Sequence, residues 1–226
     1  ASQVFGARLT EFGGEKVEQF TITTAERAEA VRRTLEQSAG GTLTVTAVEK
    51  KQRKRNPSPP FTTSTLQQEA ARKLGFGAQR TMRTAQRLYE GVDFGEGPVG
   101  LITYMRTDSV SLGIDAVREI RSTIGRLYGA EALPDSPRMY RTKSKNAQEA
   151  HEAIRPTSAA RVPEQLAGKL DADQHRLYTL IWRRAVASQM EAAVFDTVAV
   201  DLAAGPGNTF RANGSTLLSP GFLAVY

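Results

Sequence analysis

The chain has 226 residues with a formal net charge of +6 at pH 7, and its 40% of hydrophobic residues suffice for a buried core. It has no cysteine and only two histidines, which excludes disulfides, a cysteine nucleophile, thiolate metal sites and a histidine-rich zinc site. No apolar run reaches the roughly 18 residues of a membrane span, and no signal peptide is recognisable. We therefore expect a cytoplasmic protein with a polyanionic partner, nucleic acid before anionic membrane.

The first 62 residues are predicted to form strands around one helix. Residues 8–10 and 18–23 have extended character, and residues 42–48 alternate polar with apolar side chains, as in a strand that is buried on one face. Between them, Thr24 is placed to cap a helix that ends at a pair of glycines.

A basic, proline-rich run follows at residues 50–60 and has the sequence KKQRKRNPSPP. Proline disfavours both helix and central strand, so this run is predicted to be a connector. It is either a solvated linker or a basic strap that lies along a nucleic-acid backbone.

Residues 63–190 are predicted to be mainly helical, because apolar side chains recur there at helical spacing between glycines that end helices. The first helix is expected to be capped within residues 63–65, with Gln67 or Gln68 closing a capping box. The expected apolar faces are Leu66, Ala70 and Leu74; Met82, Ala85, Leu88 and Tyr89; Ile114, Val117, Ile120, Ile124 and Leu127; and Leu177, Leu180, Ile181 and Met190.

The tail returns to strand character. Residues 195–202 alternate, residues 205–208 form a turn, and residues 209–212 resume the strand. Residues 220–226 also have the composition of an apolar strand, so we expect the chain to be a piece of a longer protein.

The fold class that follows is α+β. A β-rich domain is expected to comprise residues 1–62 and 191–226, with a mainly helical domain of residues 63–190 inserted between its two parts.

Tyr104 and Arg106 are the first candidates for chemistry. They lie in a stretch predicted to be a short strand that runs into a turn at Asp108-Ser109, and a spacing of two points their side chains the same way. A phenol has an ordinary pKa of about 10, so it is a poor nucleophile unless a cation or base assists it. A guanidinium favours the phenolate and also grips a phosphate with two hydrogen bonds. Taken alone, however, such a triplet is more often a core tyrosine beside a surface arginine.

His151 and Arg155 form the second candidate pair. They are predicted to lie one turn apart on a short helix that begins at Asn146 with Glu149 in its capping box. Imidazole and guanidinium together can grip a phosphate, and histidine can transfer a proton near neutral pH. The alternative is a capped helix whose exposed side carries a histidine.

A stripe of arginines is the third. Arg80, Arg83 and Arg87 share one face of a predicted helix, which is either a solvated face or one that contacts a nucleic-acid backbone.

Four blocks of sequence together resemble bacterial DNA topoisomerase I of the type IA family, in that family's order and at close to its spacing. The strand-rich flanks resemble the family's arch, so that the resemblance covers nearly the whole chain. The blocks are residues 60–68 (PFTTSTLQQ), residues 80–91 (RTM and AQRLYEG), residues 102–109 (ITYMRTDS) and residues 148–156 (QEAHEAIRP).

The resemblance implies an isomerase that relaxes negative supercoils. The family breaks one DNA strand through a tyrosine that becomes joined to the 5′ phosphate, passes DNA through the gap and reseals it without a nucleotide cofactor. By matching position, Tyr104 resembles the nucleophile, Arg106 the arginine at the scissile phosphate, and His151 a catalytic residue that contacts DNA. The other implied DNA contacts are Gln86, Asp108, Ser109 and Arg155. The implied partners are DNA, preferentially single-stranded, and the remaining domains of a monomeric polypeptide.

Magnesium marks a departure from the family pattern. The family places Mg²⁺ in a separate acidic domain, whereas Asp171-Ala172-Asp173 is the only Asp-x-Asp here and is predicted to cap a helix. The chain alone is therefore expected to bind no metal and to be inactive. Residues 92–98 are longer than in the shortest family members and are predicted to form a surface hairpin.

Two other readings of the chain remain. A tyrosine recombinase or type IB-like strand transferase would join its tyrosine to a 3′ phosphate and usually carries that tyrosine near the C-terminus. A basic helical module would coat nucleic acid without any role for Tyr104.

Overall fold

The computed structural model describes residues 3–93, 97–141 and 152–226. The contacts between residues group the chain into two compact units. One comprises residues 1–54 and 194–219, and the other comprises residues 55–193 and 220–226. The first is dominated by strands and the second by helices, so the predicted α+β fold is confirmed.

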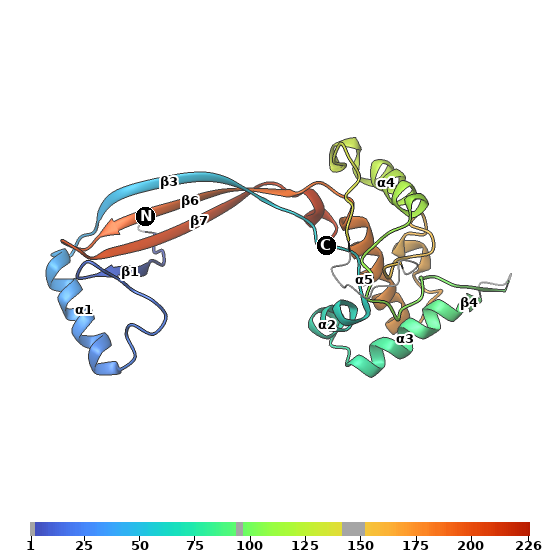
Figure 1. The fold of residues 1–226 in the computed structure, drawn as a ribbon, viewed down its shortest axis with the longest axis horizontal. Coiled ribbons are helices and arrows are strands. Elements are labelled where there is room, and N and C mark those ends of the chain that lie inside the picture. Colours follow the sequence, from blue (N-terminus) through green and yellow to red (C-terminus); the bar gives the residue numbers. More distant parts are fainter. Residues whose placement is uncertain (1–2, 94–96, 142–151) are drawn as a thin grey trace. The chain divides into compact units, whose positions relative to one another are not determined.

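The strand-rich unit is built on one five-stranded sheet in the order β2-β1-β7-β6-β3. The long strands β3, β6 and β7 run side by side as a ribbon (Figure 1). β7 pairs antiparallel with both β6 and β1. The strand bounds are β1 Arg8–Phe12, β2 Glu15–Lys16, β3 Thr44–Arg55, β6 Ala193–Ala203 and β7 Thr209–Ser219.

A small apolar core lies at one end of this sheet, under helix α1 (Ala25–Ala39). As predicted, the Thr24 hydroxyl caps the helix by accepting from the Arg27 amide, and Gly40 ends it at φ 57°. The core packs Val31, Leu35 and Ala204 against Leu9, Phe12, Ile22, Ala39 and Phe210.

Four sequence predictions for this region and the chain end were wrong. Residues 18–23 form a turn, closed by the Glu18 amide donating to the Thr21 hydroxyl, and the short strand β2 comes before them. β3 is exposed along its whole length rather than buried on one face, and it continues through residues 50–55, which we predicted to be a connector. Residues 221–224 form a 3-10 helix rather than a strand.

The helical unit contains four α-helices in its described part: α2 Thr63–Leu74, α3 Ala78–Glu90, α4 Ile114–Tyr128 and α5 Ala172–Ala187. α5 is the most buried of them, and α2, α3 and α4 all pack against it. The strands β4 (Val92–Asp93) and β5 (Pro98–Val99) pair as the predicted hairpin, whose residues 94–96 lie outside the described residues. Short 3-10 helices occupy Ala130–Ala132, Pro163–Leu166 and Gly221–Ala224.

Helix ends and apolar faces differ from prediction in detail. Thr62 caps α2, and Thr65 rather than a glutamine closes its capping box. Of the expected apolar faces, Ile114, Leu127 and Tyr89 are exposed. All three lie in the first or last turn of their helices. The largest fully buried side chains include Phe61, Phe76, Leu66, Leu88, Ile120, Ile124, Leu177 and Tyr178.

No helix in residues 3–93, 97–141 or 152–226 is both long and apolar enough to cross a membrane.

Candidate active site around Tyr104

Tyr104 lies in an extended segment between β5 and α4 that is fixed by hydrogen bonds to its backbone. The Leu101 amide donates to the Leu88 carbonyl at 2.8 Å, at the end of α3. On the other side, the Thr103 amide donates to the Arg155 carbonyl, and the Thr157 amide donates to the Leu101 carbonyl, both at 2.9 Å. The backbone that carries Tyr104 is therefore held between α3 and residues 152–157.

The predicted strand at this place was wrong in form but correct in its side-chain alternation. The segment makes one isolated bridge, from Ile102 to Pro156, and a ladder cannot continue through a proline that has no amide hydrogen. Side chains still alternate along the extended backbone. Met105, Thr107 and Ser109 are buried, whereas Tyr104, Arg106 and Asp108 are exposed.

Thr63, the first residue of α2, anchors the buried side of this segment. Its hydroxyl donates to the Met105 carbonyl at 2.7 Å and lies 3.1 Å from the Thr107 carbonyl. It also accepts from the Thr107 amide at 2.9 Å, and the Thr63 amide donates to the Thr107 carbonyl at 2.9 Å. One threonine thus fixes the backbone on both sides of Arg106.

The Tyr104 ring stands against the ring of Tyr89 on the last turn of α3. The centroids are 5.3 Å apart and the planes meet at 62°, an edge-to-face contact. Tyr104 is nevertheless 51% exposed, so the Tyr89 ring does not cover it. The close approach depends on Gly100, because a Cβ there would lie 2.8 Å from the Tyr89 carbonyl oxygen.

Arg106, Gln86 and Ser109 are three further predicted site residues, and they differ in exposure and in hydrogen-bond partners. Arg106 is exposed and has no carboxylate partner among the described residues, which leaves its guanidinium open to an anion. Gln86 donates to Glu90 at 2.5 Å on the same helix. Ser109 is buried, where its hydroxyl accepts from the Ser111 amide at 3.1 Å.

Arg155 does not lie on a helix with His151, which corrects that prediction. Ile154 and Pro156 instead form antiparallel bridges to Phe61 and Ile102, and these tertiary contacts hold the segment extended. His151, together with the expected helix start at Asn146, lies outside the described residues.

Glu152 holds the Arg155 side chain. Its Oε2 accepts from Arg155 Nη2 at 2.8 Å and from Nε at 3.2 Å. Its Oε1 accepts from the Gly113 amide at 2.7 Å, directly before α4. A single carboxylate therefore joins Arg155 to the start of that helix.

The arginine stripe on α3 is paired rather than free in two of its three members. Arg80 donates two hydrogen bonds of 2.7 Å to the Asp173 carboxylate. Arg87 Nη1 lies 2.8 Å from Asp171 Oδ2. The hydrogen bonds from Arg80 hold the pKa of Asp173 below its usual value.

Asp171 caps α5, as predicted, with Gln174 completing the capping box. No group of three or more histidine, aspartate or glutamate side chains in the described part of the chain could hold a metal ion. The carboxylates at Asp171 and Asp173 are therefore helix-capping and ion-pairing groups.

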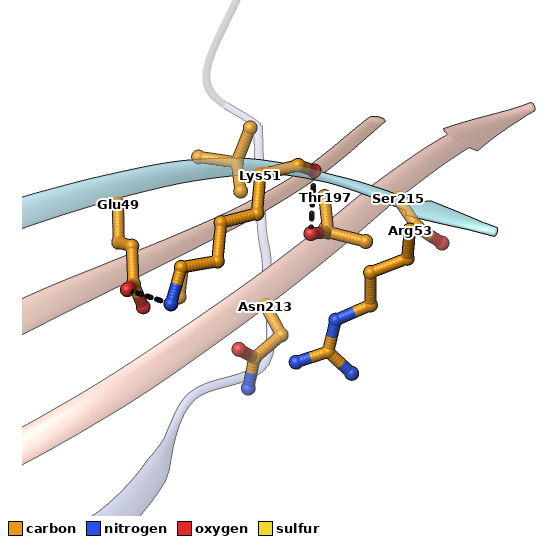
Figure 2. Close-up of a pocket in the computed structure, with 9 residues that line it drawn as sticks. Glu49, Lys51, Arg53, Thr197, Asn213 and Ser215 are labelled. Carbon is orange, nitrogen blue, oxygen red and sulfur yellow. Dashed lines mark hydrogen bonds and ion pairs between the residues drawn. The ribbon is translucent and has the colours of Figure 1, made fainter. Parts of the chain in front are cut away.

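A second polar surface lies on the ribbon of the strand-rich unit. Glu49, Lys51 and Arg53 alternate along β3, so they share one face of the sheet with Asn213 of β7 (Figure 2). Lys51 pairs with Glu49, and the Thr197 hydroxyl donates to the Lys51 carbonyl at 2.8 Å. The basic run that we read as a connector thus presents cations on a hollowed strand face.

Sequence reasoning missed Thr63, Tyr89 and Glu152 as site residues. Thr63 was visible only as a possible helix cap, and Tyr89 only as part of an apolar face. The i−3 spacing to Arg155 would have indicated Glu152 as its partner on the helix predicted there, although the structure forms this pair on an extended segment.

Comparison with known proteins shows the family of the chain. The model of the DNA topoisomerase family matches residues 3–226. The chain belongs to this DNA topoisomerase family. The predicted resemblance to bacterial topoisomerase I is thereby confirmed.

The individual relatives are named as DNA topoisomerases too. DNA topoisomerase 1 of Xylella fastidiosa strain 9a5c is 60% identical over all 226 residues, and DNA topoisomerase 1 of Rickettsia bellii is 51% identical over the same length. The solved structure of full-length topoisomerase I from Thermotoga maritima covers 96% of this chain with a TM-score of 0.76 and 34% identity. The chain spans 28% of the length of either curated relative and 33% of the Thermotoga chain.

Proposed function

We propose that this chain supplies the nucleophile of a type IA DNA topoisomerase, with Tyr104 as the residue that joins DNA. The observation that carries the proposal is an exposed tyrosine, followed two residues later by an exposed arginine, on a backbone that Thr63 and Arg155 hold in place. Membership of the DNA topoisomerase family supports it. The proposed substrate is single-stranded DNA within a negatively supercoiled molecule, in the cytoplasm of a bacterium.

The proposed reaction has two balanced steps. The Tyr104 phenol oxygen attacks a backbone phosphorus and loses its proton, while the bond from phosphorus to the 3′ oxygen breaks and that oxygen takes up a proton. The DNA 5′ phosphate is then joined to Tyr104. In the reverse step the 3′ hydroxyl attacks the same phosphorus and the phenol leaves, so no nucleotide is consumed.

The side chains near Tyr104 have separate proposed roles. The Arg106 guanidinium binds the non-bridging phosphate oxygens, whose charge increases in the transition state. His151 is proposed to transfer a proton, and Gln86, Asp108, Ser109 and Arg155 to support the DNA strand. Because Ser109 is buried and Arg155 is tied to Glu152, their proposed support acts through the backbone segment that carries Tyr104.

Magnesium does not fit the residues that the structure describes. Mg²⁺ prefers six oxygen ligands in octahedral geometry, and the described residues offer no carboxylate group of that kind. We propose that the metal-binding carboxylates lie in the part of the protein outside this chain, and that the isolated chain neither cleaves nor reseals DNA. The proposed monomer would complete the site from its own remaining domains.

The deciding experiment traps the reaction of the full-length protein with labelled single-stranded DNA and magnesium, and maps the adduct by mass spectrometry. We expect a 5′ phosphate on Tyr104 and no adduct in Tyr104→Phe. A 3′ link would favour a recombinase-like reaction, and an adduct on Tyr89, Tyr128 or Tyr140 would overturn the assignment. Magnesium-dependent cleavage by the 226-residue chain alone would refute the proposed division of the site.

A further inference from the structure

A basic pocket of about 470 Å³ lies in the helical unit, on the side of α2 that carries Glu69. We call it the Arg184 pocket. Four of its lining side chains are cationic and one is a carboxylate, which leaves an excess of positive charge. The charged residues are Arg55, Arg72, Lys73 and Arg184 against Glu69, and the uncharged polar ones are Ser58, Thr65 and Gln68.

Arg184 is the most buried of these cations, with its side chain only 10% exposed. Its Nη2 donates to the Tyr226 hydroxyl at 2.7 Å, and its guanidinium lies 4.5 Å from the centroid of the Phe61 ring and 4.4 Å from that of the Tyr226 ring. Its Nε is buried and has no hydrogen-bond partner among the described residues. A buried charge is costly unless an opposite charge and hydrogen bonds compensate it.

Glu69 cannot compensate this charge alone, because it is shared. Its Oε1 lies 2.9 Å from Arg72, and its Oε2 accepts from the Tyr226 hydroxyl at 2.8 Å. The same Oε2 lies 3.6 Å from Arg184 and 3.9 Å from Lys73. One carboxylate therefore serves three cations.

Lys73 lies in the same excess of positive charge. Its ammonium lies 3.6 Å from the centroid of the Tyr226 ring. Burial lowers its pKa below the usual value, and the neighbouring cations Arg184, Arg183 and Arg72 lower it further, against the opposite effect of Glu69. A bound anion would stabilise the charged form of Lys73.

The positive surface extends beyond the pocket. A neighbouring hollow shares Lys73 and Tyr226 with it and adds Arg176 and Arg183 to the lining. Two adjoining basic hollows match the repeated phosphates of a strand better than a single ion.

We propose that the Arg184 pocket binds a phosphate group, with Arg184 in the buried part and Arg72 and Lys73 at the accessible rim. The phosphate can come from a nucleic-acid strand or from a free phosphate. The inference rests on the proposed function only in making DNA the first source to test. None of its residues belongs to the site around Tyr104.

The test compares two arginines with matched environments. Arg72 and Arg118 are both exposed helix residues paired with a carboxylate at i−3, so Arg118→Gln controls for the change of charge in Arg72→Gln. Binding of the 226-residue chain to a labelled oligothymidylate of about 12 nucleotides is followed by fluorescence anisotropy. We expect Arg72→Gln and Lys73→Gln each to raise Kd by about 3- to 10-fold and to lower the salt slope by about 0.7, with little change for Arg118→Gln.

A second measurement separates the sources and reports on the site directly. The Lys73 pKa is followed by NMR with oligothymidylate or with inorganic phosphate, and we expect it to rise with the bound ligand. A rise with both identifies a general phosphate site, and a rise with only one identifies the source. Equal affinities for wild type, Arg72→Gln and Lys73→Gln, with an unchanged Lys73 pKa, would overturn the inference. Neither result depends on Tyr104, so the adduct experiment can fail or succeed independently.

Discussion

The edge of one ring meets the face of the other where Tyr89 and Tyr104 touch, with centroids 5.3 Å apart. The contact joins the last turn of α3 to the segment that carries the proposed nucleophile. Because Tyr104 is half exposed, the Tyr89 ring restricts the rotamers of Tyr104 without covering that side chain.

Replacing Tyr89 by alanine is therefore expected to slow the proposed strand cleavage by the full-length protein. An aromatic pair contributes about 0.5–1.5 kcal/mol, which corresponds to a loss of roughly 2- to 10-fold in the single-turnover cleavage rate. Tyr89→Phe retains the ring and should behave as wild type. If Tyr89 acts by positioning, the Kd for DNA stays unchanged in both variants. Equal loss of rate in the phenylalanine variant would instead assign the effect to the Tyr89 hydroxyl.

Thr63 is expected to stabilise the fold through its hydroxyl. Thr63→Val keeps the shape of the side chain but leaves the Met105 carbonyl and the Thr107 amide without this partner, which costs about 1–3 kcal/mol in free energy of unfolding. Thr63→Ser should restore most of that loss. Urea denaturation measures both.

The control for this prediction is Thr34→Val. The Thr34 hydroxyl also donates to a backbone carbonyl, that of Ala30, but on an exposed face of α1. We expect a change within about 0.5 kcal/mol there. A similar loss at both positions would mean that β-branching or general polarity, rather than the buried anchor, explains the effect.

Glu152 is expected to act as a remote cap for α4. Glu152→Ala removes the acceptor of the Gly113 amide, and loss of a cap costs about 0.5–2 kcal/mol. Glu152→Gln keeps an acceptor oxygen but loses the charge that holds Arg155. It should therefore lower the free energy of unfolding less than Glu152→Ala does. Hydrogen exchange at the Gly113 amide should accelerate in the alanine variant. An unchanged exchange rate there would show that the cap is dispensable.

Alkaline pH is expected to destabilise the protein through Tyr226. Burial raises the pKa of Tyr226 to about 12, above the ordinary value of about 10 for tyrosine. The folded state therefore keeps the proton more tightly, so this contribution to stability is intact below about pH 10 and is lost as the pH rises towards about 12. Because the side chain is only about half buried, we expect a loss of about 1–2 kcal/mol.

The comparison for this titration is Tyr226→Phe, whose free energy of unfolding should fall less steeply across the same pH window. A residual fall is expected, because burial also raises the pKa of Tyr178 and of Tyr140. Identical pH profiles for the two proteins would show that Tyr226 ionises normally.

Local signals predicted much of the fold. Thr24 with the following helix, Asp171 as the cap of α5, and the glycine that ends α2 are all recognisable from neighbouring residues, and the structure confirms them. The basic strand at residues 50–55 was missed because both of its faces are exposed, so no apolar alternation marks it.

The site was only partly predictable for a similar reason. The spacing of Tyr104 and Arg106 places both side chains on one side of any extended backbone. Arg155 was assigned to a helix because its helical pattern is local, whereas the bridges that hold it extended come from Phe61 and Ile102, far away in the sequence. The anchoring by Thr63 and the ring contact with Tyr89 are likewise tertiary contacts.

The position of β3 at one edge of the five-stranded sheet has a consequence for solubility. An unpaired strand edge can recruit another chain, and native proteins prevent this with short edges or with charge. The opposite edge, β2, has only two residues, whereas β3 has twelve and is protected by its cations. A second copy aligned along β3 would bring like charges together, and salt weakens that repulsion. High ionic strength should therefore be the condition under which this protein begins to self-associate.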